Sequence, residues 1–227
     1  AKKGQLECLR FLFEKGLWIE QSSSEAIVAA AEEGQLECLS FLLLKADGVD
    51  VNKESEGGTT PLYIAAQNGH ASVVELLLKA DGVDVNKESE GGTTPLYIAA
   101  QNGHASVVEL LLKADGVDVN KATEDDGATP LFIASQEGHA SVVELLLKAD
   151  GVDVNKATEE DGTTPLCIAA RKGHSSVVEL LLKADGVDVN KGNKDGATPI
   201  FIAAEKGHAS VVALLEEKLL SIEFLSL

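Results

Sequence analysis

The chain has 227 residues, and its 44% of hydrophobic residues is too high for an intrinsically disordered protein. Its 19 Lys and Arg against 37 Asp and Glu give a formal charge of −18, which argues against nucleic acids and anionic membrane surfaces as partners. No apolar run approaches the about 20 residues that a membrane-spanning helix needs. Three cysteines are too few and odd in number for a disulfide framework, which favours a reducing compartment, so we expect a cytoplasmic protein.

Self-similarity organises most of the chain. Thr-Pro pairs begin at Thr60, Thr94, Thr129, Thr164 and Thr198, with spacings of 34, 35, 35 and 34 residues. Residues 51–84 recur without change as residues 85–118. Periods of this length indicate small units that stack side by side into a solenoid, because each is too short to bury its own apolar faces.

Diverged units open the chain. Residues 34–39 repeat residues 4–9, and Ser24 stands where a cap for the first helix of the next unit is expected. Because the chain has no Met and begins inside a unit, we expect it to be part of a longer protein. We predict one domain over residues 1–227, made of a half repeat (1–18), repeats at 19–52, 53–86, 87–120, 121–155 and 156–190, and a C-terminal repeat with an extended capping helix (191–227).

The pattern of each Thr-Pro unit predicts a helix, a turn, a second helix and a loop. Thr60 can cap a helix that begins at Pro61, and Gly69 supplies its C-terminal stop. The second helix has an apolar arc too wide for one neighbour, and it exposes Glu75 and Lys79 at the spacing of an ion pair. After it we expect a break at Asp81-Gly82, an extended stretch over residues 83–86 and a hairpin-like turn back to the next Thr-Pro pair.

The chain ends in a longer helix that runs past Leu215 and carries an apolar tail. Terminal units usually need a polar outer face, so this tail, like the apolar Phe11, Phe13 and Trp18 near the other end, is a candidate contact surface.

Two repeated patterns resemble metal sites, and for both we favour a structural role. The histidines occur once per unit, about 10 Å apart at the usual spacing of packed helices, which is too far for them to share a zinc ion. The acidic loops, such as residues 47–52, lack the ligand spacing of a calcium loop. We predict no metal site, no cofactor and no catalytic residue.

One position of the first helix carries Tyr63, Tyr97, Phe132, Cys167 and Phe201 in successive units. An aromatic ladder can stack on a ligand, although packing between units is the favoured interpretation. Arg171, one helical turn after Cys167, could lower the pKa of that thiol. Cys8 and Cys38 align with core positions and are interpreted as buried small hydrophobes.

The pattern Gly58-Thr59-Thr60-Pro61-Leu62-Tyr63-Ile64-Ala65-Ala66-Gln67-Asn68-Gly69-His70, followed by Val73-Val74-Glu75-Leu76-Leu77-Leu78 and Val85-Asn86, resembles the ankyrin repeat over nearly the whole chain. The resemblance implies an all-α solenoid of stacked helix–turn–helix units with β-hairpin-like loops. It also implies a concave groove lined by the first helices and the loop tips. Ankyrin stacks generally bind proteins and are not enzymes.

The units differ mainly at the end of the first helix and at the loop tip, the two places that the resemblance assigns to the groove. Drift at unconstrained exposed positions explains this variation about as well as function does. If it is function, the partner is a protein with a basic or mixed-charge face, bound by a monomer. The predicted protein-binding residues are Glu56, Thr59, Gln67, Asn68, Glu90, Thr93, Gln101, Asn102, Asp125, Asp126, Gln136, Glu137, Glu160, Asp161, Arg171, Lys172, Lys194, Asp195, Glu205 and Lys206.

Other functions stay open at this point. The stack could be a structural spacer, or an intramolecular regulatory arm of a larger protein, that makes its contacts through the apolar ends.

Overall fold

The structure, a computed structural model, describes residues 7, 20–45, 49–55 and 57–225. Within these residues the chain forms twelve α-helices, arranged as six consecutive pairs. The pairs are α2 (Glu20–Glu32) with α3 (Leu36–Lys45), α4 (Pro61–Gln67) with α5 (Ala71–Leu78), α6 (Pro95–Gln101) with α7 (Ala105–Leu112), α8 (Pro130–Glu137) with α9 (Ala140–Leu147), α10 (Pro165–Lys172) with α11 (Ser175–Lys183), and α12 (Pro199–Lys206) with α13 (Ala209–Leu225).

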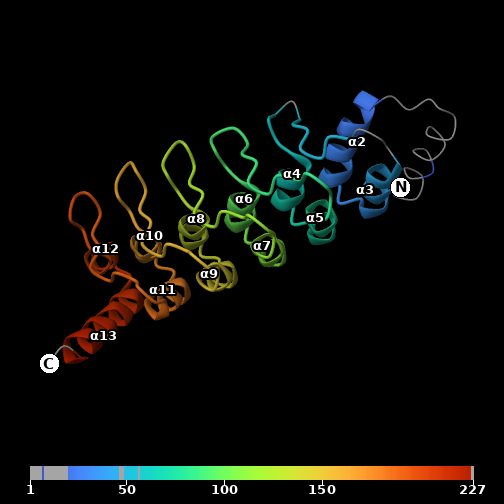
Figure 1. Ribbon diagram of the computed structural model, residues 1–227. Coiled ribbons are helices and arrows are strands. Elements are labelled where there is room, and N and C mark those ends of the chain that lie inside the picture. Colours follow the sequence, from blue (N-terminus) through green and yellow to red (C-terminus); the bar gives the residue numbers. More distant parts are fainter. Residues whose placement is uncertain (1–6, 8–19, 46–48, 56, 226–227) are drawn as a thin grey trace.

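The pairs stack in chain order into an elongated array, with α2 and α3 at one extreme and α13 at the other (Figure 1). Each first helix contacts the first helices of the neighbouring units, and each second helix contacts the neighbouring second helices. We call these two layers the inner helices and the outer helices. The predicted all-α solenoid is confirmed.

The helix ends follow the sequence signals. The Thr60 hydroxyl accepts a hydrogen bond from the amide of Tyr63 at 3.1 Å, Pro61 occupies the first helical turn, and Gly69 has a φ of +73°. The threonines before α6, α8, α10 and α12 cap in the same way.

The first pair departs from this scheme. The prediction that Ser24 caps its first helix is wrong, because α2 begins at Glu20 and Ser24 lies inside it. In the other units Pro at the first helical position keeps the preceding residue out of the helical region. This unit has no proline there, so the helix extends further toward the N-terminus. The half repeat at residues 1–18, including Cys8, Phe11, Phe13 and Trp18, lies outside the described residues apart from Glu7.

The core is one continuous strip of buried side chains between the two layers. Val74 and Leu77 of α5 are fully buried, as are their equivalents in α7, α9 and α11. Their wide apolar arc is explained by the stack, since each outer helix is covered by its own inner helix and by two neighbouring outer helices.

Each histidine joins two units, and the structural role predicted for the five histidines is confirmed. The imidazole Nε2 of His104 lies 3.0 Å from the carbonyl oxygen of Gln67 in the preceding inner helix. The other four histidines make the same contact at 2.9–3.0 Å. The ring of His104 also lies directly against Gly69, where an added Cβ would come within 2.8 Å of it.

The loops after the outer helices are tied together by asparagines. The Asn86 amide donates to the carbonyl of Gly116 at 2.7 Å, and its oxygen accepts from the amide of Asp118 at 2.8 Å, both in the next loop. Asn52, Asn120 and Asn155 repeat these two bonds. The expected extended stretch over residues 83–86 is wrong in its second half, because Val85 and Asn86 form a turn. This turn aims the asparagine side chain at the next unit.

Candidate functional site

Five long loops project from one side of the stack (Figure 1). We call them the first to fifth fingers, at residues 53–59, 87–93, 121–128, 156–163 and 191–197. No β-strand occurs among the described residues, and each finger is closed by a few hydrogen bonds, such as that from the amide of Ser89 to the carbonyl of Thr93 at 2.9 Å.

Neighbouring fingers are also bonded to each other through the backbone. The amide of Glu124 donates to the carbonyl of Gly91 at 3.1 Å, that of Glu159 to Asp126 at 2.8 Å, and that of Lys194 to Asp161 at 2.9 Å. The second to fifth fingers therefore form one connected edge. Together with the exposed C-terminal ends of the inner helices, they make what we call the finger surface.

Several predicted site residues hold the fingers in shape. One carboxylate oxygen of Asp126 accepts the Thr123 hydroxyl at 2.6 Å and the amide of Ala128 at 3.1 Å. Asp161 accepts the Thr158 hydroxyl and the amide of Thr163 in the same arrangement. Their carboxylates are therefore largely committed to their own loops.

The environment of Asp161 also changes its acidity. Partial burial would raise the pKa of this carboxyl, but the hydrogen bonds from Thr163 and Thr158, helped by the charge of Arg171, lower it to about 2. Asp161 thus stays ionised under all ordinary conditions.

In the first two fingers hydroxyl groups take over this role. The Thr59 hydroxyl pairs with that of Ser55 at 2.8 Å, and the Thr93 hydroxyl pairs with that of Ser89 at 2.6 Å. Thr93 also lies 3.3 Å from the Tyr63 hydroxyl of the preceding unit. Glu56 lies outside the described residues.

The tips themselves are left to solvent. Glu90, Asp125 and Glu160 are exposed on the second, third and fourth fingers, and Lys194 and Asp195 on the fifth. The Lys194 ammonium donates to the carbonyl of Glu159 at 2.6 Å, which ties the last finger to the fourth.

The ends of the inner helices change character along the stack. The side-chain amides of Asn68 and Asn102 donate to the carbonyls of Glu32 and Gln67 in the preceding inner helices, at 3.1 and 2.9 Å. Gln67 and Gln101 stand beside them, with exposed and half-buried side chains. The C-terminal ends of α4 and α6 therefore carry uncharged amide side chains.

Charged side chains replace these amides from α8 onward. Gln136 donates to Glu137 at 3.0 Å, Arg171 and Lys172 follow on α10, and Glu205 and Lys206 on α12 lie 3.6 Å apart. The Arg171 guanidinium reaches the fourth finger, where its Nη2 donates to the Thr163 hydroxyl at 3.2 Å and lies 3.6 Å from the Asp161 carboxylate. The structure thus brings Arg171 and Asp161 together.

The aromatic position shows two kinds of behaviour. Tyr63, Tyr97, Phe132 and Cys167 are buried beneath the next unit, which confirms their packing role. Phe201 on α12 is 61% exposed. Phe201 is absent from the predicted site residues, although the sequence places it in the last of the five Thr-Pro units.

Burial controls the titration of two members of this row. It raises the pKa of Tyr97 to about 12, helped by the negative charge of Asp126 and by Tyr63 and Glu137. It also raises the pKa of the Cys167 thiol, and this outweighs the lowering influences of the hydrogen bonds with Thr164 and of the charge of Arg171. Cys167 is therefore a buried, protonated thiol, and Cys38 is similar, with its pKa raised by burial and by Glu37.

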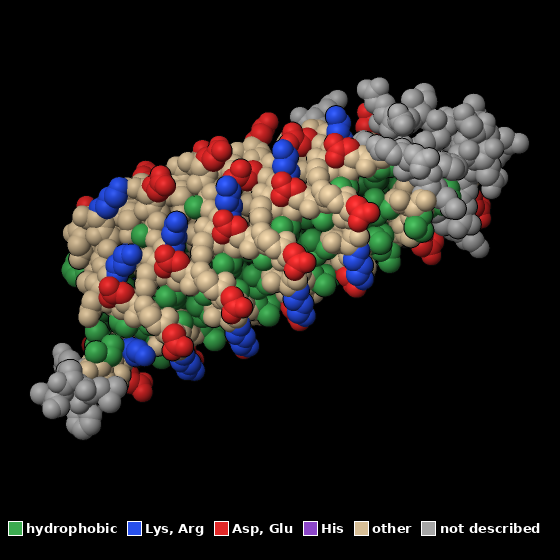
Figure 2. Space-filling model, in the orientation of Figure 1, with side chains coloured by type: hydrophobic (Ala, Val, Ile, Leu, Met, Phe, Trp, Pro, Cys, Tyr) green, Lys and Arg blue, Asp and Glu red, His purple; other side chains and the backbone are tan. Residues whose placement is uncertain are grey.

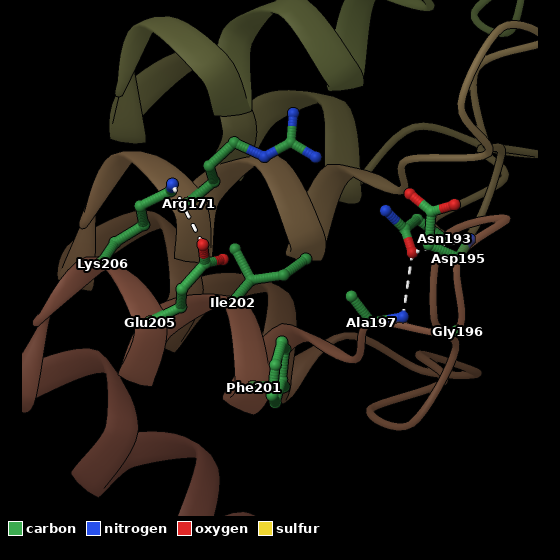
Figure 3. Close-up of a pocket in the computed structure, with 9 residues that line it drawn as sticks. All are labelled: Arg171, Asn193, Asp195, Gly196, Ala197, Phe201, Ile202, Glu205 and Lys206. Atoms are coloured by element: carbon green, nitrogen blue, oxygen red, sulfur yellow. Dashed lines mark hydrogen bonds and ion pairs between the residues drawn. The ribbon is translucent and has the colours of Figure 1, made fainter.

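A pocket of about 650 Å³ lies at the C-terminal end of the finger surface (Figure 3). Arg171 enters it from α10, and α12 contributes two apolar and two charged side chains, while the fifth finger forms the remaining wall. The lining residues are Arg171, Asn193, Asp195, Gly196, Ala197, Phe201, Ile202, Glu205 and Lys206.

Charged side chains repeat in rows along the stack (Figure 2). On the outer helices the predicted pairs form at 2.7 Å between Glu75 and Lys79 and between their equivalents in α7, α9 and α11. Because these pairs are largely exposed, each contributes well under about 1 kcal/mol to stability.

The part of the chain that the structure describes contains neither a metal-binding cluster nor a membrane-spanning helix. It contains no group of three or more His, Cys, Asp or Glu side chains that could hold a metal ion. None of the helices in this part has the length and apolar character needed to cross a bilayer.

Comparison with known proteins gives a consistent result. The family model described as ankyrin repeats (3 copies) matches residues 1–89, 27–123, 81–158 and 150–223. The fold is similar to an ankyrin repeat domain from Acinetobacter baumannii AYE (28% identity over 85% of this chain and 96% of that chain, TM-score 0.76). It is also similar to the ankyrin repeat protein EF0377 (26% identity over 85% of this chain and 97% of that chain, TM-score 0.77). A search of curated proteins found no match.

Proposed function

The chain belongs to the ankyrin repeat family, and we propose that it binds another protein through its finger surface. Ankyrin repeats are generally protein–protein interaction modules on a non-enzymatic scaffold. The general role thus comes from the family, and the proposal concerns the surface and the chemistry of the partner.

One observation carries the proposal. Exposed charges such as Asp125, Glu137 and Glu160 stand on a connected edge of fingers and helix ends, and they differ from unit to unit. The exposed Glu-Lys pairs of the outer helices recur unchanged in four units. A preorganised edge loses little conformational entropy on binding, so it suits recognition.

The charges of this surface indicate the partner. The tips of the third and fourth fingers carry six acidic residues at positions 124–126 and 159–161. Their field favours a partner with a basic or mixed-charge face and should speed its association at low salt. Asp126 and Asp161 act in this proposal mainly by holding the loops.

The test is a charge reversal that leaves the loops intact. The variant Asp125→Lys, Glu137→Lys, Glu160→Lys keeps Asp126 and Asp161. Its matched control is Glu109→Lys, Glu144→Lys, Glu179→Lys, which changes the net charge equally on the outer helices. We expect a partner captured from cell extract at low salt by the native chain and by the control to be lost with the finger variant.

A second function is favoured by a different observation. Leu220 and Ile222 on α13 are 66% and 44% exposed, although terminal units usually have a polar outer face. A spacer or regulatory arm that docks through this end would lose its partner in the variant Leu220→Ser, Ile222→Ser and keep it in the finger variant. That pair of results would contradict binding through the finger surface.

A further inference from the structure

We infer that the pocket around Phe201 anchors a short extended segment of the partner protein, in which a large apolar side chain stands next to a carboxylate and basic residues follow along the chain. The inference rests on the proposed function, and it names the partner's chemistry at the finger surface.

Phe201 supplies the apolar part of the anchor. Its equivalents in the four preceding units are at most 8% exposed because the next unit covers them, whereas Phe201 is 61% exposed. Ala197 and Ile202 line the same pocket. An exposed aromatic ring within a concave site is a typical centre of binding energy, since covering it removes a large apolar area from water.

Arg171 and Lys206 supply the charge that a carboxylate needs. Both line the pocket, next to a fourth finger whose tip is acidic at residues 159–161. The contacts of Arg171 with Thr163 and Asp161 both use Nη2, so they hold the guanidinium in place, while its Nη1 and Nε donors make no hydrogen bond or ion pair within the described residues. A fixed guanidinium can donate two parallel hydrogen bonds to a carboxylate.

The pocket also has acidic walls, and these limit what it accepts. Asp195 and Glu205 line it, and Glu205 lies 3.6 Å from Lys206. A purely acidic segment would be repelled both by these groups and by the overall charge of −18. The occupant therefore needs its own positive charges to offset this repulsion.

The third and fourth fingers are the place for those positive charges. With units about 10 Å apart, the fourth finger lies about 10 Å and the third about 20 Å from the fifth. An extended chain advances about 3.3 Å per residue, so the basic residues fall about three and six residues from the anchor. A segment of this pattern meets Phe201 and Arg171 at one end and Glu160 and Asp125 further along.

A random 12-residue peptide library displayed on phage provides the test, with the full chain as target. We expect enriched peptides to combine a Leu, Phe or Trp beside Asp or Glu with Lys or Arg about three to six residues away. The best peptide is then made with a fluorescein label, and its affinity is measured by fluorescence anisotropy. Phe201→Ala should weaken binding about tenfold or more, and Arg171→Gln combined with Lys206→Gln should have a similar effect.

Matched controls separate the anchor from general effects. Leu44→Ala removes an exposed apolar side chain of α3, outside the pocket, and Lys183→Gln removes a cation of the outer helices. Both should bind the peptide like the native chain. Because Phe201 is mostly exposed, its replacement leaves the core intact, and unchanged helix content by circular dichroism would verify this.

Three outcomes would overturn the inference. If Phe201→Ala binds the selected peptide normally while the finger variant does not, the pocket is not the anchor and the proposed function stands. If neither Phe201→Ala nor the finger variant weakens binding of the selected peptide, or if no peptide is enriched, the finger surface does not bind short segments. Both the inference and the proposed function are then contradicted for such partners. If light scattering shows a dimer of the native chain that Phe201→Ala converts to a monomer, a second copy covers this ring instead.

Discussion

At the scale of single residues, each boundary between units depends on a glycine and a histidine that fit each other. Gly103 ends an inner helix with a φ of +73°, and the ring of His139 from the next unit lies against it while bonding the carbonyl of Gln101 at 3.0 Å. A glycine is needed here for two reasons, the left-handed backbone and the space taken by the ring. Gly116 in the following loop has a φ of +76° and nothing within 4 Å of an added Cβ. At Gly116 a glycine is therefore needed only for the left-handed backbone.

These two glycines allow the two reasons to be measured separately. Gly116→Ala should cost about 1 kcal/mol of the free energy of unfolding, from backbone strain alone. Gly103→Ala should cost about 1–3 kcal/mol more, since its Cβ would lie 2.7 Å from the His139 ring. Urea unfolding measures both, and in a His139→Ala background the extra cost of Gly103→Ala should disappear. Equal costs in the native background would show that the ring moves away freely.

The buried phenol of Tyr97 predicts a loss of stability in alkali. Its pKa is about 12 in the folded chain against 10.0 for the free side chain. The folded state therefore holds the proton more tightly, so this contribution to stability is constant below pH 10 and is lost as the pH rises from 10 toward 12. Urea midpoints should fall less over this range for Tyr97→Phe than for the native chain, and parallel curves for the two proteins would contradict the assignment.

At the scale of elements, short helices are stable here because capping and cross-unit bonds supplement their packing. Helices of seven or eight residues, such as α4 and α5, are too short to be stable alone in water. The threonine caps satisfy one free amide at each inner helix from α4 to α12, and asparagines such as Asn86 bond one loop to the next. The loops are thus structural elements of the stack and connect its units as the helices do.

The asparagine contacts can be tested with a matched pair. Asn120→Ala removes bonds of 2.7 Å to the Gly151 carbonyl and 2.8 Å from the Asp153 amide in the next loop, and we expect a loss of about 1–2 kcal/mol. Asn190 has the same place in the loop after α11, but its side chain makes no such bonds within the described residues. Asn190→Ala should change stability by less than about 0.5 kcal/mol. Urea unfolding would contradict this role for Asn120 if both variants lost the same amount.

At the scale of the whole molecule, the described part of the stack is a linear array in which the helices of each unit pack against those of the neighbouring units. Its stability is then close to a sum of unit terms and boundary terms. The units also repel one another through the net charge of −18, which the exposed ion pairs of the outer helices offset only weakly. Within the described residues α12 packs against α10 and α13 but against no later inner helix, and its Phe201 is exposed.

Deleting residues 85–118 tests this linearity. Since residues 51–84 have the same sequence, every boundary that remains is native. We expect a folded chain with unchanged helix content per residue by circular dichroism, and a free energy of unfolding lower by roughly one sixth. A deletion of residues 85–104, which removes α6 and leaves α7 without its inner helix, should largely unfold the neighbouring units. Equal damage from both deletions would contradict the additive description.

The sequence by itself determined the repeat, the helix pairs, the threonine caps and the structural histidines, because these depend on local patterns that recur in every unit. It also located the variable positions at the fingers and helix ends. Only the tertiary structure decided which side chains at these positions are available to a partner and which are bonded or covered within the stack. The carboxylates of Asp126 and Asp161 close their own loops, and α2 extends back past Ser24. Phe201 is open to solvent although Phe132, at the same position of its unit, is buried. These differences depend on what the neighbouring loop or unit covers, and the pattern of a single unit does not contain that information.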